Sequence, residues 1–140
     1  MKVKQLMHKD LVTILPAATL HEAALKMKEM KVGTVLIVEN GGKLKGIVTD
    51  RDISLAVAAD AKDPNTTRAS EIMASEPVSI SFDADVDYAL RIMSQQNVRR
   101  LPVCEKERVV GILSAADVAT ELREEMNQFI GLEEAFAKHH

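Results

Sequence analysis

The residues best suited to chemistry are an aspartate and a hydroxyl residue that occur together twice. Asp52 follows Thr49 by three positions and Asp117 follows Ser114 by three, each time after a glycine and two β-forming residues. Hydroxyl-x-x-acid is typical of a helix start, where both side chains accept from free backbone N–H groups. The same surroundings suit a ligand, because a helix start favours phosphate and a carboxylate accepts from a ribose diol. The motif alone leaves the structural and the functional interpretation open.

The two motifs belong to an internal repeat. Residues 5–53 align with residues 71–118 at an offset of 66, which falls to 65 after a one-residue deletion in the second hairpin, and eleven aligned positions are identical. A fixed period with matching apolar positions indicates a duplicated structural unit. Leu6-Met7 opens the first unit and Ile72-Met73 opens the second.

Each repeat predicts the order strand, helix, strand, strand, helix. In the first repeat, Thr19 and Glu22 form a capping box before a helix over about 20–31, and residues 35–38 read as a buried strand. The turn Asn40-Gly41-Gly42 leads into a return strand over 45–49 and a helix over about 51–59. A unit this small leaves its sheet uncovered, so the two should pack together about a pseudo-twofold axis.

The expected fold is therefore α/β (α+β), with two β-α-β-β-α units packed through their sheets and a C-terminal helical extension. The predicted boundaries are 1–60 for the first unit, 61–70 for a linker, 71–122 for the second unit and 123–140 for the tail. The tail carries an apolar stripe that Gly131 interrupts, which predicts packing against the body or a second subunit. The stripe consists of Leu122, Met126, Phe129, Ile130, Leu132 and Phe136.

Composition argues against several classes of protein. The net charge of −3 and the lack of a dense Lys/Arg run disfavour a nucleic-acid partner. No apolar run approaches the roughly 20 residues that span a bilayer, so no membrane partner is expected. Cys104 is the single cysteine, which excludes an intrachain disulfide and favours the reducing cytoplasm.

The paired pattern resembles the cystathionine-β-synthase (CBS) domain tandem, or Bateman module, of the stand-alone prokaryotic type. The resemblance covers about residues 3–122 and rests on the unit starts, on the segment from Val98 to Val103 and on the two glycine-to-aspartate motifs. It implies a sensor that binds AMP, ADP, ATP or S-adenosylmethionine between the units, forms a homodimer and signals to an unidentified effector protein. No cofactor is expected, and Mg²⁺ only through the phosphates of ATP.

The resemblance also implies ligand-binding residues. Asp52 and Thr49 serve one cleft, with Arg51 beside them for phosphate, while Asp117 and Ser114 serve the other. The second motif lacks a cation at the position of Arg51, and Arg99 or Arg100 is expected to supply it. Gly33 and Thr34 match these two arginines in the first unit, so the clefts should differ in affinity. The apolar candidates around adenine, which are also core residues by pattern, are Ile14, Val32, Val35, Ile80, Val98 and Pro102.

Two other classes of function were weighed. For an enzyme, Cys104 ends an apolar strand as a buried thiol, and His8 and His21 lack partners at metal-ligand spacing and read as surface residues. No catalytic set emerges, so no enzyme and no metal site is expected. The remaining alternative is a structural dimerisation module without a physiological ligand.

Overall fold

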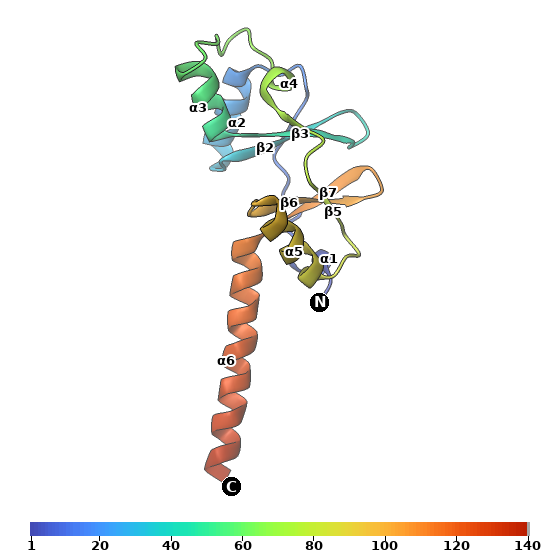
Figure 1. Ribbon diagram of the computed structural model, residues 1–140, viewed down its shortest axis with the longest axis vertical. Helices are drawn as coiled ribbons and strands as arrows, with labels where there is room; N and C mark the ends of the chain where they lie inside the picture. Colours follow the sequence, from blue (N-terminus) through green and yellow to red (C-terminus); the bar gives the residue numbers. More distant parts are fainter. Residues whose placement is uncertain (140) are drawn as a thin grey trace.

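The computed structural model describes residues 1–139, and His140, the last residue of the predicted tail, lies outside it. Helices cover the outer sides of two small sheets that face each other (Figure 1). The first half of the chain contains α1 Val3–Leu6, β1 Thr13–Ile14, α2 Leu20–Met30, β2 Thr34–Val38, β3 Leu44–Thr49 and α3 Asp50–Ala58. The second half contains α4 Ala69–Ile72, β4 Ala74–Ser75, β5 Ile80–Ser81, α5 Val86–Gln96, β6 Arg100–Glu105, β7 Arg108–Ser114 and α6 Ala115–His139.

The predicted α/β fold of two similar units is confirmed. One sheet has the order β1-β2-β3-β4 and the other the order β5-β6-β7. In both, a parallel strand pair is followed by an antiparallel hairpin, with Ile14 opposite Ile37 and Ile80 opposite Val103. A helix that begins with a Thr or Ser cap follows each hairpin. Each sequence repeat thus forms one parallel strand pair, one hairpin and the helix that follows it.

The short helices α1 and α4 are exchanged between the units. The N–H of Val3 donates to the carbonyl of Ala84 in the second unit (2.8 Å). In the matching contact, the N–H of Ala69 donates to the carbonyl of Ala18 in the first unit (2.7 Å). Val3 is fully buried in the second core and Ala69 in the first. Leu6-Met7 and Ile72-Met73 thus open the two repeats along the sequence, but in space each segment completes the core of the other unit.

The sheets meet along a shared apolar layer. Leu36 and Val38 of the first sheet pack with Cys104 and Val109 of the second. The hairpins also touch, since the N–H of Val109 donates to the carbonyl of Gly42 (3.0 Å). Burial of these side chains holds the two units together. A large apolar side chain contributes about 1.5–3 kcal/mol of stabilisation when it is fully buried. The expected packing through the sheets is confirmed.

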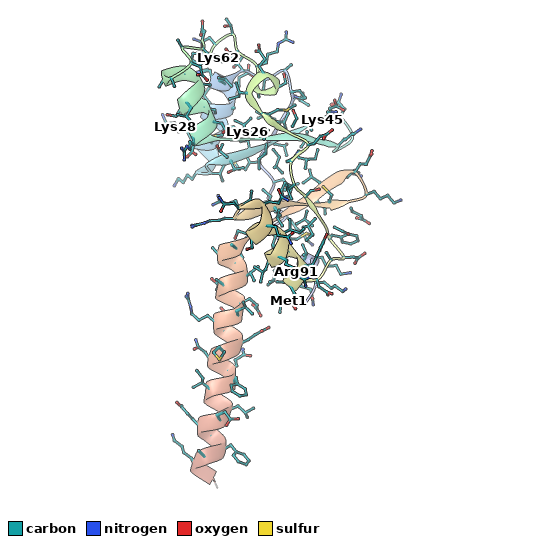
Figure 2. All side chains as sticks on the ribbon, in the orientation of Figure 1. Met1, Lys26, Lys28, Lys45, Lys62 and Arg91 are labelled. Atoms are coloured by element: carbon teal, nitrogen blue, oxygen red, sulfur yellow. The ribbon has the colours of Figure 1, made fainter. Side chains whose placement is uncertain are left out.

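Helix α6 runs without a break from the second motif to His139 and projects away from the body (Figure 1). Gly131 does not end the helix, and its position has open space around it. Met126 and Phe129 are each 57% exposed, so the body does not cover the apolar stripe beyond the first turns. Packing against the body is thus wrong for this part of the tail. The side chains of the lower half of α6 extend outward on all sides (Figure 2).

No helix in the described part of the chain combines the length and the apolar character needed to cross a membrane.

Candidate ligand-binding site

The second motif places Asp117 at the start of α6 with its carboxylate turned toward a hollow. The hydroxyl of Ser114 donates to Asp117 Oδ2 (2.5 Å), and the N–H of Asp117 donates back to Ser114 Oγ (3.1 Å). His8 Nε2 lies 2.6 Å from the same Oδ2 atom. The side chain of Asp117 is 34% exposed, so the carboxylate is held by side chains but reachable from solvent.

Two arginines border this hollow. Its volume is about 720 Å³, and Arg99 and Arg100 line it together with Ser114 and Asp117. Both arginines are exposed, and among residues 1–139 the salt bridges leave both without a carboxylate partner. Two guanidinium groups beside one carboxylate give the hollow an excess of positive charge. Such a surface suits a phosphate, which guanidinium groups bind bidentately. The predicted Arg99, Arg100, Ser114 and Asp117 thus come together.

A second hollow of about 320 Å³ adjoins the first. It is lined by Val12, Val32 and Gly33 from the first unit, and both hollows are bordered by His8, Arg100 and Ile112. The larger hollow holds the charged side chains of Arg99, Arg100 and Asp117, whereas Val12 and Val32 make part of the smaller one apolar. Together they offer the mixed lining that binds a small amphipathic ligand.

The first motif uses its carboxylate differently. Asp52 Oδ2 accepts from the N–H of Thr49 (2.9 Å), and Thr49 Oγ1 accepts from the N–H of Asp52 (3.2 Å). This reciprocal pair is a complete capping box. Thr49, Arg51 and Asp52 line neither of these two hollows, nor a third hollow on the first unit. The helix-start interpretation therefore suits the first motif, and the ligand interpretation suits the second.

The residues at matching positions explain this difference. Gly33 matches Arg99, and their carbonyls accept from the N–H groups of Asp50 and Ala115 (2.9 and 2.8 Å). A Cβ added to Gly33 would lie 3.0 Å from Asp50 Oδ2, so the acid leaves little room for a side chain there. In the second unit, Ala115 takes the place of Asp50 and leaves Arg99 free to border the hollow. The expected inequality of the clefts has a steric and an electrostatic basis.

The apolar candidates are divided between hollows and cores. Val32 borders the small hollow, and Ile14 borders a separate open hollow of about 650 Å³ on the first unit. Val35 and Ile80 are 0% and 5% exposed in the two cores. The adenine contact predicted for Val35 does not fit this burial, because the side chain has no exposed surface. Val98 packs against the second core and Pro102 is buried in β6.

Sequence reasoning missed His8, which was interpreted as a surface residue. Its side chain is 63% exposed but reaches Asp117, because the exchanged N-terminal segment runs along β7. Two backbone hydrogen bonds fix that segment, from His8 N–H to the Ile112 carbonyl (2.8 Å) and from Ile112 N–H to the His8 carbonyl (2.9 Å). The repeat places Ala74 at the matching position, against Ile47. Only knowledge of the exchange could have assigned His8 to the second motif.

Cys104 lies away from the hollows, in the layer between the sheets. It is 9% exposed, and burial raises the pKa of its thiol, although a hydrogen bond with Ser79 opposes that rise. A thiol with a raised pKa is a poor nucleophile. Among the described residues, no three His, Cys, Asp or Glu side chains come together to hold a metal ion.

The CBS domain family model matches the chain twice, over residues 3–59 and 69–124. The chain belongs to the CBS-domain family. Both matches include a hydroxyl-x-x-aspartate motif, and together they cover both units. CBS domain pairs are regulatory modules.

Two relatives from bacteria resemble most of the chain. The CBS domain-containing protein YhcV of Bacillus subtilis (strain 168) is 39% identical over 117 residues, which are 84% of this chain and 82% of YhcV. Hypoxic response protein 1 of Mycobacterium tuberculosis is 37% identical over 106 residues, covering 76% of this chain and 74% of that protein.

Two solved structures share the fold. Hypoxic Response Protein I with two coordinated zinc ions superposes with a TM-score of 0.79 at 32% identity, covering 86% of this chain and 98% of that one. The CBS domain pair of protein MJ0100, in complex with 5′-methylthioadenosine and S-adenosyl-L-methionine, gives a TM-score of 0.77 at 29% identity. That match covers 89% of this chain and 98% of the other.

Proposed function

We propose that this protein is a regulatory module that binds an adenosine-containing nucleotide in the hollow beside the second motif. The observation that carries the proposal is the pair Arg99 and Arg100, which border the same hollow as Ser114 and the carboxylate of Asp117. Phosphate binds at the arginines and the start of α6, and Asp117 accepts from the ribose hydroxyls. A ligand with an anionic group and a diol is required to use both features.

The neighbouring hollow has room for the base. Val12, Val32 and Ile112 border it, and aliphatic side chains of this kind pack against the faces of a purine. The complex of MJ0100 with two adenosyl compounds supports this choice of ligand class. AMP, ADP, ATP and S-adenosylmethionine remain the candidates, and the two arginines favour the three that carry phosphate. No cofactor is required, and Mg²⁺ enters only through the phosphates of ATP.

The first cleft is proposed to bind more weakly. Asp52 is engaged in its capping box, and Asp50 places a second negative charge near Arg51. Thr49, Arg51 and Asp52 therefore contribute a secondary site at most. Ile14, Ile80, Val98 and Pro102 are proposed mainly to support the strands around the clefts.

Signalling is proposed to pass through a homodimer to a separate effector protein in the cytoplasm. The exposed stripe on α6, with Leu122 at 53% and Phe129 at 57% exposure, offers the apolar surface that association requires. A hexameric CBS-CP12 protein among the structural neighbours supports self-association within the family. The same stripe favours the second candidate function, a structural dimerisation module without a ligand.

A thermal-shift screen separates the two functions. A ligand at 100 times its dissociation constant stabilises the folded state by about 2.7 kcal/mol. We expect AMP to raise the melting temperature more than adenosine does at equal concentration. If AMP, ADP, ATP and S-adenosylmethionine all leave the melting temperature unchanged at millimolar concentration, the sensor function is wrong and the dimerisation module stands.

A further inference from the structure

His8 occupies the position that divides the two hollows. Together with Arg100 and Ile112 it borders both the larger hollow, beside the arginines, and the smaller one, beside Val12. A nucleotide that places its phosphate in one hollow and its base in the other must pass this side chain. The contacts of the His8 side chain therefore affect the affinity of every ligand that uses both hollows.

The imidazole of His8 also occupies the carboxylate oxygen that a ribose diol needs. Nε2 lies 2.6 Å from Asp117 Oδ2, and the hydroxyl of Ser114 already donates to the same atom. A diol recognised by both oxygens of one carboxylate competes with a donor already bound there. The first unit has no histidine there, because Ala74 stands at the matching position, and Asp52 Oδ2 accepts from the N–H of Thr49 instead.

The side chain of His8 is free to move while its backbone is not. The imidazole is 63% exposed, whereas the main chain is tied to Ile112 by hydrogen bonds in both directions. Rotation of the side chain leaves the strand pairing intact. The charged group facing His8 from α6 is Asp117, and Arg100 of β6 lies across the shared border.

We propose that His8 is a latch and a specificity-determining residue of the nucleotide site. In the ligand-free protein its imidazole holds Asp117, and a ribose diol must displace it. The latch therefore weakens a ligand that uses both ribose hydroxyls more than a ligand that has only one of them. It rests on the proposed nucleotide function and assigns that site a residue from the N-terminal segment.

The test is isothermal titration of AMP and 2′-deoxy-AMP into the parent protein and His8→Ala. An exposed contact of this kind contributes at most about 1 kcal/mol, whether or not the imidazole is charged, so His8→Ala should bind AMP up to about fivefold more tightly than the parent does. The gain for 2′-deoxy-AMP should stay below about twofold, because a ribose with one hydroxyl competes less for Asp117. A merely structural role of His8 does not produce a gain that depends on the diol.

His21→Ala serves as the matched control, because His21 is an exposed histidine on α2 and lines neither hollow. It should bind both nucleotides as the parent does. Unchanged or weaker AMP binding by His8→Ala, with normal binding by the parent, overturns the latch and leaves the proposed function intact. If neither the parent nor His8→Ala binds AMP, the proposed function fails and the latch fails with it.

Discussion

Replacing Arg99 and Arg100 by the residues at the matching positions of the first unit should abolish most of the preference for phosphate. The double variant Arg99→Gly, Arg100→Thr gives the border of the larger hollow the residues that stand at the matching positions of the first unit, Gly33 and Thr34. The fold should tolerate it, because the carbonyls of Gly33 and Arg99 make equivalent hydrogen bonds (2.9 and 2.8 Å). Only the two side chains and their charges are lost.

The magnitude follows from the exposure of the two arginines. Both side chains are exposed, so each pairing with phosphate is worth about 1 kcal/mol rather than the larger value of a buried pair. The double variant should lose about 2 kcal/mol for AMP, which is roughly 30-fold in the dissociation constant. Adenosine has no phosphate, and its affinity should stay within about twofold of the parent's.

Isothermal titration of AMP and adenosine at low and high salt measures both effects. Parent affinity for AMP should fall with ionic strength, and this salt dependence should weaken in the variant. Arg91→Ala is the control, since Arg91 is exposed on α5 and does not line the hollow. An equal loss for AMP and adenosine, or no loss for either, would refute the phosphate role of the two arginines.

Three further predictions concern single positions. Asp117→Asn should weaken AMP binding about tenfold in isothermal titration, which is the lower end of the range for a hydrogen bond to a charged group. Asp52→Asn should change the affinity for AMP by less than about twofold. Because burial raises the pKa of the Cys104 thiol, the folded protein keeps a proton that the unfolded chain loses above about pH 8.5. Urea unfolding should therefore show stability falling with rising pH in the parent and less steeply in Cys104→Val. Val3→Ala should cost about 2 kcal/mol in the same assay, because Val3 is fully buried in the second core, and a loss below 0.5 kcal/mol would contradict the exchange.

Most of the fold could be predicted because its signals are local. The capping box of Thr19 and Glu22 begins α2 where expected, and the glycine pair of the first hairpin adopts positive φ angles of 90°. The apolar residues of β2 are buried as their continuous run indicates. These features depend on neighbouring residues, which a sequence displays directly.

The exchange of α1 and α4 could not be predicted, because it depends on which core each segment meets. Val3 and Ala69 have the same apolar character and occupy equivalent places in the repeat, so either pairing satisfies the pattern. His8 was missed for this reason. The difference between Asp52 and Asp117 could not be predicted either, since Asp52 accepts from Thr49 within its own motif whereas Asp117 contacts His8 from outside it.

The most direct test of the central claim is a crystal structure of the protein grown with AMP. The phosphate should lie against Arg99 or Arg100 at the start of α6, with the ribose hydroxyls on Asp117 and the base near Val32. Density for AMP beside Asp52 alone, or empty hollows at a saturating concentration, would contradict the assignment of the site to the second motif.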